Sequence, residues 1–172
     1  KDRKEKFIRE YQRKHFGNNF EGATLSQSEI AFRAPEQQQI SQWFKASKDF
    51  LVMIGPPGTG KTHMCAALTG EAWWKFNTVR VWREQNLFTH LRDAIERFGD
   101  YINTLKQALD DEFCVIDDIG STPVNDWRKE IIFNAIDIRR EMGYPTVLTS
   151  NYTQQELTNK YEARVTSRLF GG

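Results

Sequence analysis

The sequence predicts an α/β fold in which a central parallel sheet is covered by helices on both faces. Short apolar segments typical of buried strands alternate with longer segments of helical periodicity, as in a parallel sheet with crossover helices. A glycine-rich segment, GPPGTGKT at residues 55–62, lies between the first of these strands and the next helix. With 172 residues, the chain has the length of a single domain with room for a core.

The chain begins with a basic segment. Residues 1–14 contain seven Lys or Arg and three Asp or Glu. We expect residues 1–16 to form a partly helical arm or linker, and residues 17–172 to form the core domain. Most such charge runs are solvated, and contact with a nucleic acid or a partner is the alternative. Residues 17–36 predict a loop with one short helical turn.

A helix and the first strand come next. Pro35 suits the first turn of a helix, where its missing N–H has no intrahelical partner to lose. Ile40, Trp43 and Phe44 then mark one helical face. The apolar run Phe50–Ile54 predicts the first strand, which ends where the glycine-rich segment begins.

The middle of the chain repeats the alternation of helix and strand. A helix is expected over residues 62–75, and the alternating segment 78–82 predicts the second strand. Apolar residues at helical spacing predict an amphipathic helix over residues 86–98, which Gly99 ends. A second short helix is expected around residues 102–109.

The last third of the chain contains two more strands. The apolar run 113–116 predicts the third strand, and a helix over residues 127–142 ends at the following Gly-Tyr-Pro segment. Residues 146–150 predict the fourth strand. The segment TQQE at residues 153–156 has the form of a capping box that opens another helix.

The segment GPPGTGKT matches the phosphate-binding pattern G-x-x-x-x-G-K-[ST] at every fixed position. Its backbone N–H groups and the N-terminus of the following helix form an anion site. Because glycine has no side chain, phosphates can approach this backbone closely. We expect Lys61 to reach the β- and γ-phosphates of a nucleotide, and the Thr62 hydroxyl to bind Mg²⁺. A glycine-rich turn that matches by chance is the alternative.

Two acidic residues follow the third strand. In the segment FCVIDD, four apolar residues precede Asp117 and Asp118, which is the Walker B pattern. We expect Asp117 to hold Mg²⁺ next to Thr62, and Asp118 to act as a general base or to position the attacking water. An exposed acidic turn is the usual alternative for such a pair.

Asn151 follows the fourth strand. Ligands of such sheets bind at the carboxyl ends of the strands, so the glycine-rich segment, Asp117 and Asn151 can converge on one site. The Asn151 amide can orient water or contact a γ-phosphate; a turn before the capping box is the alternative. Arg164 and Arg168 lie four residues apart on one helix face. Such arginines are usually solvated, but one can stabilise transition-state charge at a neighbouring copy's γ-phosphate.

Composition excludes several classes of protein. The net charge is +1, so the overall charge does not demand a nucleic-acid partner. The two cysteines lie in apolar segments without metal-type spacing, and we expect them to be reduced core residues. No apolar stretch approaches 18 residues and the sequence shows no signal peptide, so we expect a cytoplasmic protein that does not cross a membrane.

Together these motifs resemble those of AAA+ ATPases, in particular the DnaC-type helicase loaders and their IstB-type transposition relatives. The resemblance covers residues 17 to 170. It is carried by NFE at 19–21, GPPGTGKTH at 55–63, VIDDIG at 115–120, PTVLTSN at 145–151 and RVTSRL at 164–169. It implies a P-loop NTPase fold, a three-layer αβα sandwich that binds ATP or ADP with Mg²⁺. The residues implied to bind nucleotide are Gly55, Pro56, Pro57, Gly58, Thr59, Gly60, Lys61, Thr62 and His63.

The resemblance also implies roles for residues outside the glycine-rich segment. Asn151 takes the place of the sensor 1 residue and Arg168 that of the arginine finger. The helix 86–98 takes the place of an extra helix in initiator-type AAA+ proteins, and family members use that region and the loop after Walker B to bind single-stranded DNA. Candidate DNA contacts are Phe88, Arg92, Arg128 and Lys129. The alternative is that Phe88 is a core residue and the cations are solvated.

The implied function is an ATPase that self-associates through its ATP site, binds single-stranded DNA and places a DnaB-type replicative helicase, in the cytoplasm of a bacterium or encoded by a phage. The first alternative is an IstB-like transposition ATPase that acts on duplex DNA with a transposase. A small-molecule P-loop kinase would need an arginine-rich substrate lid, which the sequence does not show. A non-hydrolysing adaptor that uses ATP only for assembly is a third alternative.

Two departures from the family pattern matter. Asp118 stands where most AAA+ ATPases carry glutamate, and its shorter side chain leads us to expect slow hydrolysis. The sequence stops soon after Arg168, so the C-terminal lid and its sensor 2 arginine are expected to be absent or truncated.

Overall fold

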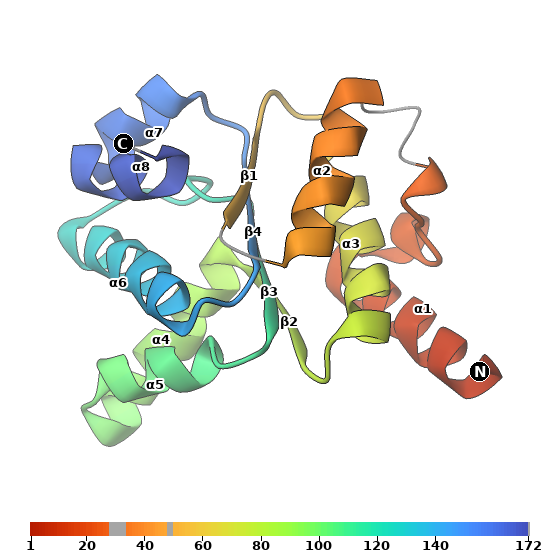
Figure 1. Ribbon diagram of the computed structural model, residues 1–172. Helices are drawn as coiled ribbons and strands as arrows, with labels where there is room; N and C mark the ends of the chain where they lie inside the picture. Colours follow the sequence, from red (N-terminus) through yellow and green to blue (C-terminus); the bar gives the residue numbers. More distant parts are fainter. Residues whose placement is uncertain (28–33, 48–49, 172) are drawn as a thin grey trace.

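The computed structural model describes residues 1–27, 34–47 and 50–171. Within these residues the chain forms a sheet of four parallel strands in the order β1-β4-β3-β2 (Figure 1). The strands are β1 (Phe50–Ile54), β2 (Val79–Arg83), β3 (Phe113–Asp117) and β4 (Thr146–Ser150). The parallel sheet expected from the sequence is confirmed, and only β2 lies one residue later than expected.

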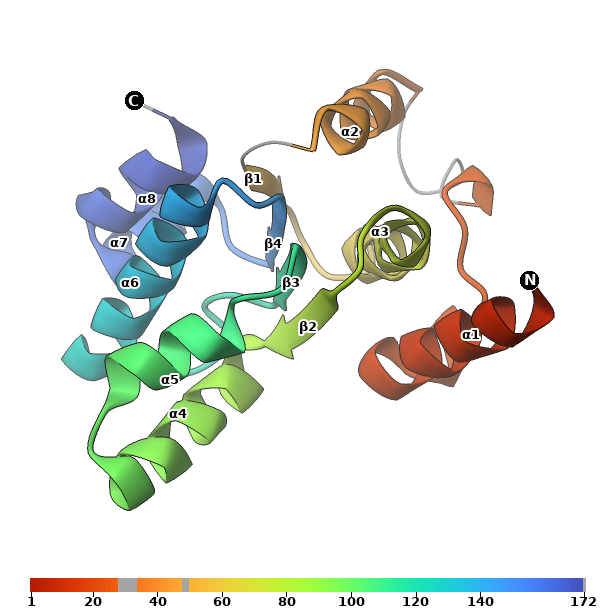
Figure 2. The same cartoon turned by 60° about the horizontal axis from the view of Figure 1, so that its bottom comes forward.

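Helices cover both faces of the sheet, which gives the three-layer αβα arrangement that was predicted (Figures 1 and 2). One face carries α2 and α3, and α1 packs on α3. The other face carries α4 to α8. The helices are α1 (Asp2–Phe16), α2 (Ala34–Ala46), α3 (Lys61–Lys75), α4 (Glu84–Phe98), α5 (Tyr101–Ala108), α6 (Asp126–Met142), α7 (Gln154–Tyr161) and α8 (Ala163–Phe170).

The two central strands explain the continuous apolar runs in the sequence. Every residue of β3 and of β4 is buried, because these strands have a neighbour on each side and helices on both faces. The edge strands β1 and β2 keep partly exposed residues. The predicted strands were therefore easiest to recognise where the sheet is most completely covered.

Two apolar cores lie on opposite faces of the sheet. On the α3 side, small residues of that helix pack closely on the strands, and Cys65 is fully buried there. On the other side, Leu87 and Leu91 of α4 pack in one cluster with Ile131 and other residues of α6. Cys65 and Cys114 are free and buried, which confirms the expectation that they are core residues.

Most element boundaries agree with the sequence analysis. Gly99 and Gly143 follow the last residues of α4 and α6, and the capping box of Thr153 with Glu156 opens α7. The clearest difference is at α4, which begins at Glu84, two residues before the expected start. There is consequently no loop between β2 and α4.

The basic segment at the N-terminus forms α1, whose buried residues are Ile8, Gln12 and Phe16. The Gln12 side chain donates to the carbonyls of Ala23 and Ala66 at 3.0 and 2.9 Å. The expected helical turn is a 3₁₀ helix, η1 (Asn18–Phe20). Residues 28–33 of the expected loop lie outside the described residues. The division of the chain into an arm and a core domain at residue 16 stays a prediction.

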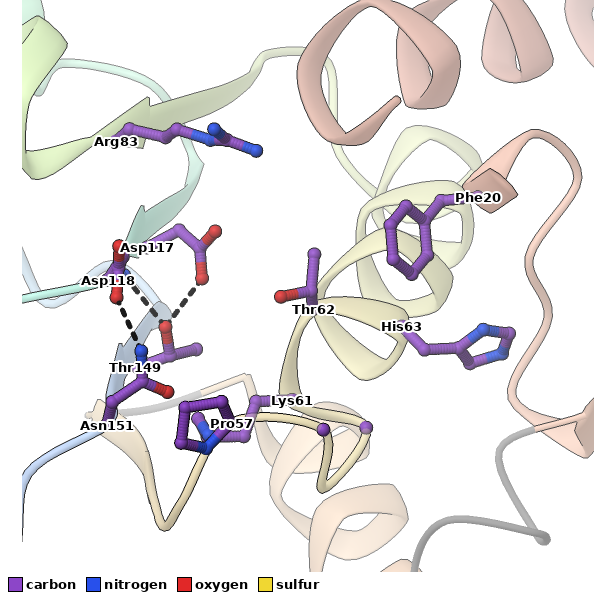
Figure 3. Close-up of a pocket in the computed structure, with 12 residues that line it drawn as sticks. Phe20, Pro57, Lys61, Thr62, His63, Arg83, Asp117, Asp118, Thr149 and Asn151 are labelled. Atoms are coloured by element: carbon purple, nitrogen blue, oxygen red, sulfur yellow. Dashed lines mark hydrogen bonds between the residues drawn. The ribbon is translucent and has the colours of Figure 1, made fainter. Parts of the chain in front are cut away.

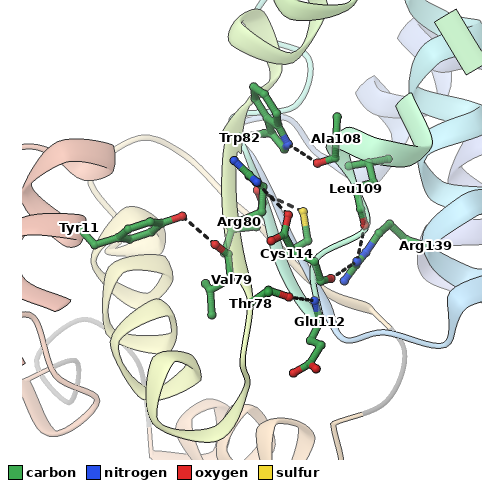
Figure 4. Close-up of polar contacts among 12 residues, drawn as sticks. Tyr11, Thr78, Val79, Arg80, Trp82, Ala108, Leu109, Glu112, Cys114 and Arg139 are labelled. Carbon is green, nitrogen blue, oxygen red and sulfur yellow. Dashed lines mark hydrogen bonds and ion pairs between the residues drawn. The ribbon is translucent and has the colours of Figure 1, made fainter. Parts of the chain in front are cut away.

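The two ends of the sheet carry different polar environments. The carboxyl ends of the strands surround a pocket (Figure 3). Near the amino ends, the side chain of Arg139 on α6 is fully buried and donates to the Leu109 carbonyl (Figure 4). It also donates to Thr146 Oγ1 and to the carbonyls of Asp111 and Pro145. Beside it, Arg80 pairs with Asp111 at 2.9 Å and the Tyr11 hydroxyl donates to the Val79 carbonyl at 2.9 Å.

Candidate functional site

A pocket of about 460 Å³ lies at the carboxyl ends of the strands (Figure 3). It is bounded by η1, by the loop between β1 and α3, and by the ends of β2, β3 and β4. Its lining residues are Phe20, Pro57, Gly58, Gly60, Lys61, Thr62, His63, Arg83, Asp117, Asp118, Thr149 and Asn151. Most of the predicted nucleotide residues and both Walker B acids therefore lie around one volume. Gly55, Pro56 and Thr59 line an adjoining groove along β1.

The glycine-rich loop has the backbone conformation that a phosphate cradle needs. Gly58 and Gly60 have φ angles of 81° and 86°, which L side chains rarely adopt. A Cβ atom at Gly58 would meet nothing within 4 Å, so conformation rather than space requires glycine there. Among the described residues, no side chain caps the N-terminus of α3. Its first backbone N–H groups are therefore suited to an anion.

Lys61 places a buried positive charge beside this loop. Its Nζ atom donates to the carbonyls of Gly55 at 2.6 Å and of Pro56 at 2.9 Å. Burial lowers the pKa of Lys61 from its ordinary value, while the carboxylates of Asp117 and Asp118 act in the opposite direction. The ammonium group thus lies against the glycine-rich loop, and Lys61 lines the same pocket as the two acids.

Asp117 ends β3 with its carboxylate in the pocket. Thr149 Oγ1 donates to its Oδ1 atom at 2.5 Å. Burial raises the pKa of Asp117, and the hydrogen bond from Thr149 opposes that rise. The Asp117 carboxylate and the Thr62 hydroxyl point into the pocket from opposite sides (Figure 3). One carboxylate and one hydroxyl, completed by phosphate oxygens and water, are a donor set that suits Mg²⁺.

Asp118 has an unusual backbone. Its φ angle is 64°, in the left-handed region that residues with a side chain seldom enter. Two contacts hold it: its N–H donates to Thr149 Oγ1 at 2.9 Å, and Asn151 Nδ2 donates to its Oδ1 atom at 3.0 Å. Backbone strain of this kind is found preferentially at functional sites. Thr149 therefore connects both acids, since its hydroxyl contacts each of them.

Three pocket residues were not among the predicted site residues. Arg83 ends β2, directly beside Asp117 in the strand register. Thr149 lies in β4, and Phe20 comes from η1, where its ring lies 6.3 Å from that of His63. Arg83 follows the carboxyl end of a predicted strand, so the rule that identified Asn151 also applies to Arg83. Thr149 and Phe20 lie within the segments PTVLTSN and NFE that carry the family resemblance. Nothing in the sequence marks them as pocket residues, because their positions depend on strand order and on the packing of a distant loop.

Arg168 does not line the pocket. It lies on α8, where its Nε atom pairs with Asp137 Oδ1 at 2.5 Å. Its guanidinium stacks on the Phe133 ring, 4.4 Å from the centroid, and Nη1 donates to the Arg164 carbonyl at 3.1 Å. The structure therefore places Arg168 apart from this chain's own phosphate cradle, with its side chain about one third exposed.

The structure corrects one of the candidate DNA contacts. Phe88 is only 3% exposed and packs in the core against Trp127, so its ring is not accessible for stacking on a base. Arg128 covers the outer face of that ring at 5.2 Å, and Lys129 pairs with Glu162 at 3.2 Å. Arg92 is exposed. The three cations remain candidates for phosphate contacts, and the alternative that Phe88 is a core residue is correct.

In residues 1–27, 34–47 and 50–171 there is no helix long and apolar enough to cross a membrane. The same residues contain no group of three His, Cys, Asp or Glu side chains arranged to hold a metal ion.

Sequence comparison relates the chain to known ATP-binding proteins. Residues 23–168 match the family described as IstB-like ATP binding protein. The replicative helicase loader DnaC of Escherichia coli strain K12 is 26% identical over 133 residues, which are 77% of this chain and 54% of that protein. The chain thus spans about half the length of the curated relatives it matches.

Comparison with solved structures supports the fold. The crystal structure of the DnaC helicase loader superposes with a TM-score of 0.74 and 21% sequence identity, covering 88% of this chain and 94% of the other. The replication initiator DnaA bound to AMPPCP and single-stranded DNA gives a TM-score of 0.72 at 18% identity, covering 87% of this chain and 48% of the other. Both likenesses concern the α/β P-loop NTPase fold of AAA+ domains.

The glycine-rich cradle, the two acids after β3 and the match over residues 23–168 agree with one another. This chain belongs to the IstB-like ATP-binding family, in the group of AAA+ ATPases that includes DnaC.

Proposed function

We propose that this chain is the ATPase core of a helicase loader. It binds Mg²⁺ and ATP, assembles with further copies, holds single-stranded DNA and helps to place a DnaB-type replicative helicase in the bacterial cytoplasm. The observation that carries the proposal is the composition of the pocket. Lys61, Thr62, Asp117, Asp118 and Asn151 line it, whereas Arg168 lies outside it on α8.

The nucleotide phosphates would occupy the cradle of the glycine-rich loop. Backbone N–H groups at the N-terminus of α3 and the Lys61 ammonium would neutralise the β- and γ-phosphates. Bound Mg²⁺ would supply charge neutralisation between phosphate oxygens, with Thr62 and Asp117 as its protein ligands. Phe20 and His63 lie on the side of the pocket away from Asp117, where a nucleoside would lie (Figure 3).

Hydrolysis would depend on Asp118. Its carboxylate is fixed by the Asn151 amide at 3.0 Å and its backbone by Thr149. In this position it can orient a water molecule and accept its proton as the water attacks the γ-phosphate. The aspartate reaches less far than a glutamate, so we expect a low rate in the isolated chain.

A second copy would complete the site through Arg168. Asp137 and Phe133 hold this side chain at the surface of α8. A guanidinium from a neighbouring copy can stabilise negative charge that develops on the phosphates in the transition state. Hydrolysis would then require assembly, and the cations Arg92, Arg128 and Lys129 would contact the phosphates of single-stranded DNA.

A subunit-mixing experiment tests the shared site. Lys61→Ala and Arg168→Ala variants should each lose assembly-dependent hydrolysis for different reasons. In a mixture, the intact cradle of the Arg168→Ala copy can meet Arg168 of the Lys61→Ala copy, so activity should partly return. Arg164→Ala is the matched control, since it changes an arginine four residues away on the same helix. Full ATPase activity of Arg168→Ala alone, or no recovery in the mixture, would contradict the shared site.

A transposition ATPase that acts on duplex DNA with a transposase is the second candidate function, and the match to the IstB-like family supports it. The two can be separated by affinity capture in the presence of ATP. The full-length protein should retain the host's replicative helicase if it is a loader. Capture of a transposase, together with tighter binding to duplex than to single-stranded DNA, would favour the alternative.

A further inference from the structure

The first residue of α4, Glu84, is a carboxylate with no exposed surface. Glutamate is rarely buried completely, because its desolvated charge must be compensated by hydrogen bonds. Glu84 also follows Arg83, which lines the pocket at the end of β2. The buried side chain therefore starts within one residue of the candidate nucleotide site.

Four hydrogen bonds converge on the Glu84 carboxylate, all from neutral groups. The backbone N–H of Gly120 donates to Oε1 at 2.9 Å. The Thr122 hydroxyl and N–H donate to Oε2 at 2.8 and 3.3 Å. The hydroxyl of Tyr161, the last residue of α7, donates to Oε1. One side chain thus connects the start of α4, the loop after Asp118 and the helix that follows Asn151.

The loop after Asp118 is tightly held on its other side too. The Ile119 N–H donates to the Thr149 carbonyl at 2.8 Å, and the Ser150 hydroxyl donates to the Ile119 carbonyl at 2.6 Å. Gly120 has a φ angle of 89°, and a Cβ atom there would lie 2.9 Å from the Tyr152 ring. The loop consequently passes between Glu84 and the residues around the start of α7.

We propose that Glu84 is a positioning residue for ATP hydrolysis. Asp118, two residues before Gly120, has a left-handed backbone that is held directly by Thr149 and Asn151. Glu84 adds a second restraint by fixing Gly120 and Thr122, and it fixes Arg83 through the start of α4. The inference rests on the proposed ATPase function. It adds that α4, which carries Arg92, is coupled to the catalytic acid through one buried carboxylate.

A Glu84→Gln variant tests this role with little change in shape. In the wild type, both oxygens of the Glu84 carboxylate accept hydrogen bonds. In the variant, an NH₂ group replaces one of these oxygens and cannot accept, so at least one hydrogen bond is lost. Misplacement of catalytic groups by about 1 Å can cost about a hundredfold in rate. We expect kcat for ATP hydrolysis to fall by at least about tenfold, with the ATP dissociation constant within about twofold of wild type.

The matched control is Asp111→Asn, which neutralises another buried carboxylate at the opposite end of the sheet. It should lower thermal stability without changing kcat. Tyr161→Phe removes a single donor from the network and should lower kcat less than Glu84→Gln. Because both changes act on one network, the effects of the double variant should be less than additive.

Hydrogen exchange measured on the peptide spanning residues 118–124 provides a readout that does not need turnover. Glu84→Gln should exchange faster there, and should lose the added protection that ATP gives the wild-type peptide. An unchanged kcat in Glu84→Gln, or an equal loss in Asp111→Asn, would overturn the positioning role. If the wild-type protein binds ATP without hydrolysing it, the enzymatic part of the proposed function fails. The positioning role then depends on the exchange data. It would be refuted if ATP protected residues 118–124 from exchange equally in the wild-type and Glu84→Gln proteins, or in neither of them.

Discussion

The two ends of the central sheet contain buried charge in opposite circumstances. At the amino end, the Arg139 guanidinium donates to the Leu109 carbonyl (Figure 4). It also donates to Thr146 Oγ1 and to the carbonyls of Asp111 and Pro145. At the carboxyl end, Lys61 and Asp117 face a pocket of about 460 Å³ (Figure 3). Charged side chains are thus fully enclosed by protein at the amino end, whereas at the carboxyl end they line a pocket.

The difference separates structural from functional polar groups. Buried polar atoms in folded proteins nearly always have partners, and Arg139 follows that rule without using strained backbone. The pocket departs from it. Asp118 has a left-handed φ angle. The buried Nε2 atom of His63 has no hydrogen-bond partner among the described residues, as is also the case for side-chain nitrogens of Gln37, Trp43 and Trp73 outside this pocket. Locally unfavourable features of this kind are expected where a ligand binds.

The largest effect should come from Asp118→Asn at the open end. The amide cannot accept a proton from water, so kcat for ATP hydrolysis should fall by about 10²–10⁴-fold. Nucleotide affinity should change little, because the cradle and Lys61 are intact. Steady-state turnover and equilibrium binding of a fluorescent ATP analogue measure the two quantities separately. A variant that hydrolyses ATP normally would show that Asp118 is not the general base.

At the sealed end, Arg139→Met should cost stability instead of activity. Removing the guanidinium leaves several buried carbonyls without donors, and we expect the free energy of unfolding to fall by about 3–5 kcal/mol. Urea denaturation followed by tryptophan fluorescence measures this loss. At a temperature where the variant stays folded, its ATP affinity should equal that of wild type. A specific loss of ATP binding would abolish the distinction between the two ends.

Lys61→Ala should weaken ATP binding by about a hundredfold or more, as charge-assisted hydrogen bonds to phosphate are lost. Stability should change little or rise, since burial lowers the pKa of Lys61 and the folded state therefore disfavours its charge. Isothermal titration with ATP and a parallel melting curve test both statements. If the variant bound ATP with unchanged affinity, Lys61 would not be a phosphate-binding residue.

The smallest effect is expected for Tyr11→Phe, which removes one hydrogen bond between α1 and β2. Loss of a neutral hydrogen bond costs about 1 kcal/mol at neutral pH. Burial raises the pKa of Tyr11 to about 12, above the value near 10 of an unfolded chain. The unfolded wild-type protein therefore loses its proton first, and the wild-type advantage should shrink as pH rises from 10 toward 12.

Melting curves of the two proteins at pH 7 and at pH 11 measure this difference. A Tyr11→Phe variant as stable as wild type at pH 7 would show that the hydrogen bond to Val79 does not contribute to stability, and that α1 is held by its other buried residues.

Local patterns explain why the secondary structure was predictable. The apolar runs at β3 and β4 are continuous because these strands are buried, and β1 has a similar run although it is a partly exposed edge strand. The capping box at Thr153 is a local signal. The spacing of the phosphate-binding pattern likewise lies within eight residues. The order of the strands in the sheet, β1-β4-β3-β2, is a non-local property. The contact of Thr149 with both acids depends on this order.

Side chains with two plausible environments could not be assigned from the sequence. Phe88 has the spacing of a core residue and also lies near cations, and only the packing of α6 against α4 shows that it is buried. Glu84 and Arg139 look like ordinary charged residues at helix positions. The partners of Glu84 lie 36 to 77 residues away in sequence, and two of the Arg139 partners, Asp111 and Leu109, lie 28 and 30 residues away. No local pattern therefore reveals that these side chains are buried.

The restraint of Arg168 has a consequence for how copies would associate. A freely moving arginine loses about 2 kcal/mol of rotamer entropy when it is immobilised. Contacts with Asp137, Phe133 and the Arg164 carbonyl already restrict this side chain within a single copy. Much of that entropy is therefore lost during folding, before any encounter between copies. An interface built on Arg168 can then form and dissociate without reordering the residue on which it depends.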